Sequence, residues 1–133
     1  MAKGTAGGLQ SYGPLVLRLV LGAAMAYHGY QKVVPHGALV HHEQFVRTLG
    51  LPGWLGIVSA WTEFAGGILL VLGLLTRFAA FMVAGNMLVA LVKVNLHHGY
   101  AGAEYSLALF AMAVALVVMG GGALAADRRI GLS

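Results

Sequence analysis

The stretch Pro14–Lys32, PLVLRLVLGAAMAYHGYQK, decides how the rest of this chain can fold. It is apolar for most of its length, and a helix rising about 1.5 Å per residue would carry it across most of a bilayer. Arg18, His28 and Lys32 nevertheless interrupt it, and helical spacing places these three on one face. Cations are costly against lipid, so we expect this face to contact other helices, water or a ligand.

The composition is that of an integral membrane protein. Of the 133 residues, 59% are hydrophobic and 9% are charged, whereas a soluble domain is about one quarter charged. The formal net charge of +4 does not indicate a nucleic-acid partner, because basic residues at the ends of membrane helices follow from topology. With no cysteine, the chain itself cannot carry disulfides, thiolate metal ligands or a persulfide intermediate.

Hydrophobic stretches separated by turns rich in glycine, proline or charge predict an all-α fold, an integral membrane four-helix bundle. The bundle is expected over residues 14–126, between a polar tail at 1–13 and a basic tail at 127–133. Its membrane helices are expected at about 14–31, 54–75, 78–95 and 105–124. In the long first loop, residues 42–49 have the pattern of a short amphipathic helix that turns Phe45, Val46 and Leu49 to the membrane.

Basic residues near the helix ends predict the orientation. Four spans place both termini on one side, with Lys3, Arg77, Arg128 and Arg129, against Lys32, Arg47 and Lys93 on the other. We therefore predict a multi-pass protein of the bacterial plasma membrane with cytoplasmic termini. An even number of spans also brings many polar residues to the outer end, namely His28, Lys32, His36, His41, His42, Lys93, His97, His98 and Glu104.

Glu63 is the most informative polar residue inside a predicted membrane helix. The helical rise places it about 13 Å from the outer end of the second helix, and places Arg18 about 15 Å below His28. Residues at similar depth can neutralise each other, so the sequence predicts an Arg18–Glu63 ion pair between the first two helices. Such a pair could be purely structural, or Glu63 could bind a ligand or carry protons.

His28 and Lys32 are one helical turn apart at the outer end of the first helix. Lys32 could extend to the interface while His28 is an ordinary interface histidine. Alternatively the two bind an anionic or quinone-type head group, since histidine can donate to a carbonyl and exchange a proton near neutral pH. In that interpretation Lys93 and His97 line the same site, and Glu104 pairs with Lys32 or Lys93 at its mouth.

The histidines do not form a pattern typical of metal binding. His41-His42 and His97-His98 are adjacent pairs, whose side chains point in different directions on a helix. No His-x-x-x-His or Glu-x-x-His spacing occurs. We therefore expect no metal site and expect the loop histidines to be solvated.

Several sequence pieces occur together and in order along nearly the whole chain. Arg18 is followed by HGYQK at 28–32, FVRTLGLP at 45–52, TEFAGGILLVLGLLTR at 62–77 and Glu104-Tyr105 at the predicted start of the last helix. In these pieces the chain resembles the DoxX family of small bacterial four-helix membrane proteins. That family includes relatives of DoxD, the membrane subunit of a thiosulfate:quinone oxidoreductase, and members associated with oxidative-stress defence and thiol handling.

The resemblance implies a plasma-membrane bundle that faces quinone, with quinone as the expected cofactor and a redox protein as the expected partner. The chain would then be a non-catalytic or quinone-binding subunit of an oxidoreductase. Its other expected partner is the lipid bilayer, and a homo-oligomer is one of the possible assemblies. Its polar pocket would use Arg18, His28, Lys32, Glu63, Lys93, His97 and Glu104 for ligand binding or proton relay.

Two other classes of function stay open at this point. A small proton- or cation-coupled transporter or channel would use Glu63 as its coupling carboxylate and would work as a dimer, because one small bundle cannot enclose a path. A non-catalytic scaffold would hold a soluble partner through the 33–53 loop. Only the scaffold would tolerate Glu63→Gln and fail on substitution of loop residues.

Overall fold

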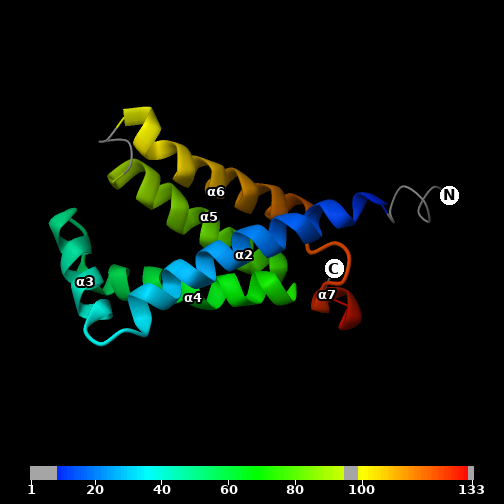
Figure 1. Ribbon diagram of the computed structural model, residues 1–133, viewed down its shortest axis with the longest axis horizontal. Coiled ribbons are helices and arrows are strands. Elements are labelled where there is room, and N and C mark those ends of the chain that lie inside the picture. Colours follow the sequence, from blue (N-terminus) through cyan, green and yellow to red (C-terminus); the bar gives the residue numbers. More distant parts are fainter. Residues whose placement is uncertain (1–8, 95–98, 132–133) are drawn as a thin grey trace.

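The computed structural model describes residues 9–94 and 99–131. Every regular element within them is a helix, which confirms the all-α prediction (Figure 1). The helices are α2 (Tyr12–Val33), α3 (Ala38–Thr48), α4 (Gly53–Leu72), α5 (Thr76–Lys93), α6 (Gly99–Met119) and the short α7 (Ala126–Arg129). The four long helices run alternately up and down, with α3 at one end of the molecule and α7 at the other (Figure 1).

The prediction of four helices is wrong in count, because five helices of eleven residues or more lie within the described ranges. The additional one is α3, which begins at Ala38, four residues before the predicted amphipathic segment, after Gly37 in the left-handed region at φ +76°. It packs across the first turns of α4. Val46 is buried against Gly56 there rather than turned to the membrane, while Phe45 is exposed.

The last long helix lies earlier in the chain than predicted. It spans Gly99–Met119 rather than 105–124, because Gly120 and Gly122 adopt positive φ angles of +77° and +70° that end the helix. The second predicted helix is shortened for the same reason. It ends at Leu72, before Gly73 at φ +72°.

Close packing of α2 on α4 determines which residues of the two helices lie level with one another. A Cβ added to Gly22 would lie 2.8 Å from the carbonyl oxygen of Gly67, and one added to Gly29 would overlap the backbone of Phe64. Glycine at these positions therefore allows the two backbones to approach closely, as small residues do between membrane helices. The contact continues into a core that includes Leu21, Met25, Leu70, Val83 and Leu116.

Two helices in the described part of the chain, α4 and α5, are long and apolar enough to cross a membrane. The apolar stretch Ala103–Met119 of α6 is shorter. Many large side chains on these helices are exposed and apolar, among them Trp61, Phe78 and Phe81. Such a surface suits lipid rather than water.

Arg18 does not pair with Glu63, so the predicted clamp is wrong. Its Nε donates to the carbonyl oxygen of Gly121 at 2.7 Å and its Nη2 to that of Ala123 at 2.8 Å. Its Nη1 donates to the carbonyls of Leu70 and Val71, both at 3.2 Å, at the end of α4. The guanidinium thus satisfies carbonyl groups that a helix end and a glycine-rich loop leave without partners.

Asp127 completes the polar contacts at the α7 end. Its carboxylate accepts hydrogen bonds from the backbone N–H groups of Leu75, at 2.6 Å, and Thr76, at 2.8 Å. These N–H groups begin α5, where the helix dipole favours a negative charge. Arg18 and Asp127 together therefore fasten the C-terminal segment to the start of α5 and the end of α4.

Candidate functional site

A cavity of about 430 Å³ lies between α3, α4 and α5, beside the last turn of α2. This volume falls within the range of small-molecule sites. Most of its wall is apolar, with side chains such as Val58, Phe81 and Met87. The polar residues that line it are Lys32, His42, Ser59, Thr62, Glu63 and Asn86.

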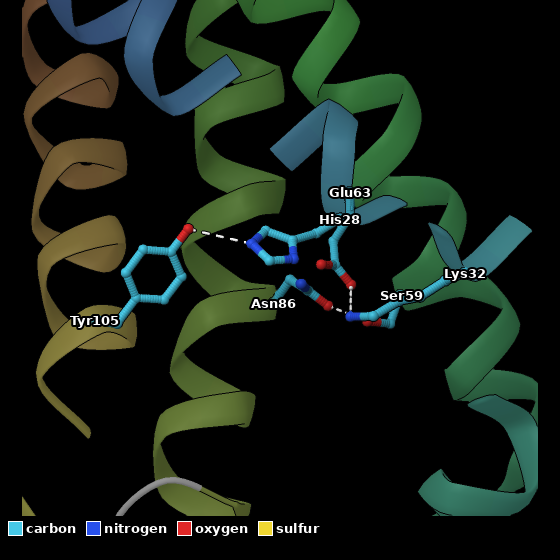
Figure 2. Close-up of polar contacts among 6 residues, drawn as sticks. All are labelled: His28, Lys32, Ser59, Glu63, Asn86 and Tyr105. Carbon is cyan, nitrogen blue, oxygen red and sulfur yellow. Dashed lines mark hydrogen bonds and ion pairs between the residues drawn. The ribbon is translucent and has the colours of Figure 1, made fainter. Parts of the chain in front are cut away.

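Lys32 and Glu63 form an ion pair in the wall of the cavity, with 2.7 Å between Nζ and Oε2 (Figure 2). The Glu63 side chain is 3% exposed and that of Lys32 is 33% exposed. Lys32 lies in the last turn of α2, where the helix dipole favours a cation. Because α2 continues to Val33 and packs closely on α4, Lys32 rather than Arg18 lies level with Glu63.

Ser59 and Asn86 connect α4 to α5 on the same wall. The Ser59 hydroxyl donates a hydrogen bond to the Asn86 Oδ1 (Figure 2). Ser59 is four residues before Glu63, so both side chains lie on the same face of α4. The Lys32–Glu63 ion pair and the Ser59–Asn86 hydrogen bond therefore lie one helical turn apart along the cavity wall.

His42 reaches the cavity from α3, although the sequence predicts that it is solvated. Its Nε2 is buried and has no hydrogen-bond partner among residues 9–94 and 99–131. Burial lowers the pKa of His42, and the nearby charge of Lys32 lowers it further, while Glu63 opposes both effects. The imidazole is therefore neutral at neutral pH.

His28 faces away from this cavity, toward α6 (Figure 2). Its Nε2 lies 3.2 Å from the Tyr105 hydroxyl, and the two rings meet edge to face with centroids 6.0 Å apart. It is not among the cavity-lining residues. The one-turn spacing from Lys32 thus does not bring the two side chains to one site, because Lys32 turns toward α4.

The remaining predicted site residues do not gather at the cavity either. Lys93 and Glu104 are exposed, and within the described residues neither forms an ion pair; Lys32 pairs with Glu63 instead of Glu104. Arg18 is held near the α7 end. His97 lies outside the described residues.

Four polar residues of the cavity are absent from the predicted site: His42, Ser59, Thr62 and Asn86. A signal for two of them is present in the sequence. Ser59 precedes Glu63 by one turn, and Asn86 is a polar amide inside an otherwise apolar helix, where it needs a partner. His42 carries no such signal, because its burial depends on how α3 packs on α4.

Comparison with known proteins identifies relatives of this chain by sequence. A sequence model of the DoxX family, described simply as DoxX, matches residues 13–96. The chain is 31% identical over 116 residues to "Putative oxidoreductase CatD" of Bacillus subtilis (strain 168), covering 86% of this chain and 84% of that protein.

A second relative is "Inner membrane protein YqjF" of Escherichia coli (strain K12), 29% identical over 77 residues, or 58% of this chain and 57% of that protein. No solved structure matches the chain. The match of the family model and the coverage of the first relative show that this chain belongs to the DoxX family, a family of helical membrane proteins.

Proposed function

We propose that this protein is a quinone-interacting membrane subunit of a redox system, and that it binds the quinone head group in the cavity between α3, α4 and α5. The observation that carries the proposal is the ion pair between half-buried Lys32 and buried Glu63 in the wall of an otherwise apolar cavity. An apolar pocket with a few convergent polar groups fits a ligand that is mostly hydrocarbon with a small polar end. The name of the relative from Bacillus subtilis, "Putative oxidoreductase CatD", supports the same class of function.

The chain's own residues would hold such a ligand by hydrogen bonding. The Lys32 ammonium has three protons, and its Nζ directs one of them to Glu63. The others can donate to a carbonyl oxygen, while Glu63 keeps the ammonium in place. A bound quinone would supply a carbonyl pair that accepts two electrons and two protons. The electrons would come from a partner protein and the protons from water at the α3 end of the bundle.

We further propose that the four long helices cross the bacterial plasma membrane and that the α7 end is cytoplasmic. By sequence, four basic residues are assigned to that side and three to the other, namely Lys3, Arg77, Arg128 and Arg129 against Lys32, Arg47 and Lys93. This small excess supports the proposal, because cytoplasmic segments carry more positive charge. The cavity then opens near the outer side of the membrane. The name of the relative from Escherichia coli, an inner membrane protein, supports this location.

The test is a quinone titration on the purified protein in nanodiscs, together with mass spectrometry of any co-purifying lipid-soluble molecule. We expect saturable binding of a short-chain ubiquinone by the native chain. Lys32→Met should weaken it by about tenfold, because it removes a charged hydrogen-bond donor. His28→Ala is the matched control, since His28 lies one turn earlier on α2 and outside the cavity, and it should bind normally.

Equal binding by the native protein and Lys32→Met would contradict the proposed site. Absence of binding by the native protein would contradict the proposed function itself.

A proton-coupled transporter is the second candidate, and one observation favours it. Glu63 is a buried carboxylate beside a cavity, as a coupling residue within a membrane would be. Proton flux into liposomes that contain the protein, abolished by Glu63→Gln and unaffected by quinone, would favour this candidate over the first.

A further inference from the structure

The polar groups of the cavity wall are not equally satisfied. Lys32 and Glu63 neutralise each other at 2.7 Å, and the Ser59 hydroxyl is directed to Asn86. The Nε2 of His42, in contrast, is buried and has no hydrogen-bond partner in the part of the chain that the structure describes. A buried polar atom without a partner costs free energy that a suitable ligand can recover.

The charges around His42 also bear on what kind of ligand the cavity can hold. The positive charge of Lys32, from α2, is balanced by Glu63, from α4. On α3 itself, Arg47 is paired with Glu43 at 2.8 Å. No cation among the described residues that line the cavity is left unbalanced, so an anionic head group would lose its hydration without gaining a counter-charge.

We propose that His42 is a ligand-binding residue whose Nε2 hydrogen-bonds an uncharged carbonyl or hydroxyl head group in this cavity. The inference rests on the proposed function and deepens it, because it excludes fatty acids and other anionic lipids as ligands of the same site. The lowered pKa of His42 agrees with it, since a neutral imidazole adds no positive charge to the cavity. It also makes α3 part of the binding site rather than a simple connection.

The experiment compares three probes of similar hydrocarbon length: decylubiquinone, decylbenzene and laurate. Binding to the full chain in nanodiscs is measured by calorimetry for the native protein and for His42→Phe, which keeps a ring but removes its nitrogens. We expect His42→Phe to lose about tenfold in affinity for decylubiquinone and nothing for decylbenzene. We also expect the native protein to prefer decylubiquinone to laurate.

Two further variants separate binding from packing. His41→Phe makes the same change at the exposed neighbouring position of α3 and should leave all three affinities unchanged. His42→Gln keeps a side chain that can hydrogen-bond and should retain affinity within about threefold of the native value. If His42→Phe does not fold, His42→Leu takes its place, because it also lacks hydrogen-bonding atoms and should show the same loss for decylubiquinone alone.

The outcomes distinguish this inference from the function on which it rests. Unchanged decylubiquinone affinity in His42→Phe, with native binding intact, would overturn the role of His42 alone. An equal loss for decylubiquinone and decylbenzene would mean that His42 only packs. Tighter binding of laurate than of decylubiquinone would overturn the uncharged head group, and no binding of any probe by the native protein would overturn both proposals.

Discussion

Arg18 and Lys32 are two cations of the same helix that are satisfied in different ways. Arg18 distributes its donors over backbone carbonyls of the α4 end and the loop after α6. Lys32 has one carboxylate partner, Glu63. The difference follows from chemistry, because guanidinium has five donors in a planar array and ammonium has three on one atom.

This difference predicts the result of two double-mutant cycles. Lys32→Met and Glu63→Gln should couple by about 1–3 kcal/mol in the free energy of unfolding, because they remove the two partners of one ion pair. Arg18→Met and Glu63→Gln should instead add within about 0.5 kcal/mol. Reversible unfolding in mixed detergent micelles measures both cycles, and coupling between Arg18 and Glu63 would contradict the observed contacts.

Asp127 gives a second prediction at this scale. Asp127→Ala removes both side-chain acceptors from the first N–H groups of α5 and should lower the free energy of unfolding by about 1–2 kcal/mol. Arg129→Ala, two residues later and exposed, is the control and should have little effect. Thermal unfolding in detergent provides the comparison, and equal stability of the two variants would argue against the cap.

At the scale of an element, α3 is the helix whose packing is predicted least well from the sequence. Its amphipathic pattern predicts a helix on the membrane surface. In the structure, Gly53 and Gly56 at the start of α4 leave room for Arg47, Glu43 and Val46 to pack closely. The apolar face of α3 therefore covers α4 and one side of the cavity.

The burial of His42 predicts a pH dependence of stability. Well above about pH 6.5 its imidazole is neutral in both the folded and the unfolded state, so it has no effect on the pH dependence of stability. As the pH falls below that value, the unfolded chain binds a proton that the folded chain resists, because the folded-state pKa is lowered. Stability contributed by this site is therefore lost on acidification.

Melting temperatures at about pH 7.5 and pH 5.5 test this. The native protein and His41→Phe should both lose more stability between these pH values than His42→Phe does. The same loss in all three would show that His42 does not titrate differently in the folded state.

The contact between α2 and α4 makes a prediction about glycine. Gly29→Ala would bring a Cβ against the backbone of Phe64 and should destabilise the protein by about 1–3 kcal/mol. Gly13→Ala, in the first turn of the same helix with nothing within 4 Å, should stabilise it by up to about 1 kcal/mol. Both changes can be measured by unfolding in detergent, and equal effects would contradict the close approach.

At the scale of the whole molecule, the sequence predicts the class and the helical periodicity well, but not the pairing of helices. Hydrophobic stretches reveal the long helices, and Lys32 and Glu63 stand out as charges within them. Which charges meet depends on backbone approach at Gly22 and Gly29 and on how far α2 continues, neither of which a periodic pattern contains. The predicted bounds of the last helix are shifted toward the C-terminus, because Gly120 and Gly122 lie in an apolar stretch that resembles the rest of the helix.

The absence of cysteine makes the proposed orientation directly testable. Single cysteines at Gln44, in α3, and at Ile130, after α7, occupy exposed positions at opposite ends of the molecule. With cytoplasmic termini, a membrane-impermeant maleimide applied to intact cells should label Gln44→Cys and leave Ile130→Cys unlabelled until the cells are opened. The reverse pattern would place the termini outside.

The cavity wall includes side chains on the outer surface of the bundle: Phe81 is 66% exposed, Val89 49% and Val58 46%. In the proposed membrane placement, a pocket with such a border would exchange its contents with the hydrocarbon phase, where an apolar ligand is concentrated by partitioning. Its occupancy would therefore depend on the mole fraction of ligand in the lipid rather than on the amount per litre of buffer. Diluting the membranes with ligand-free lipid should empty the site, whereas diluting the suspension with buffer should not.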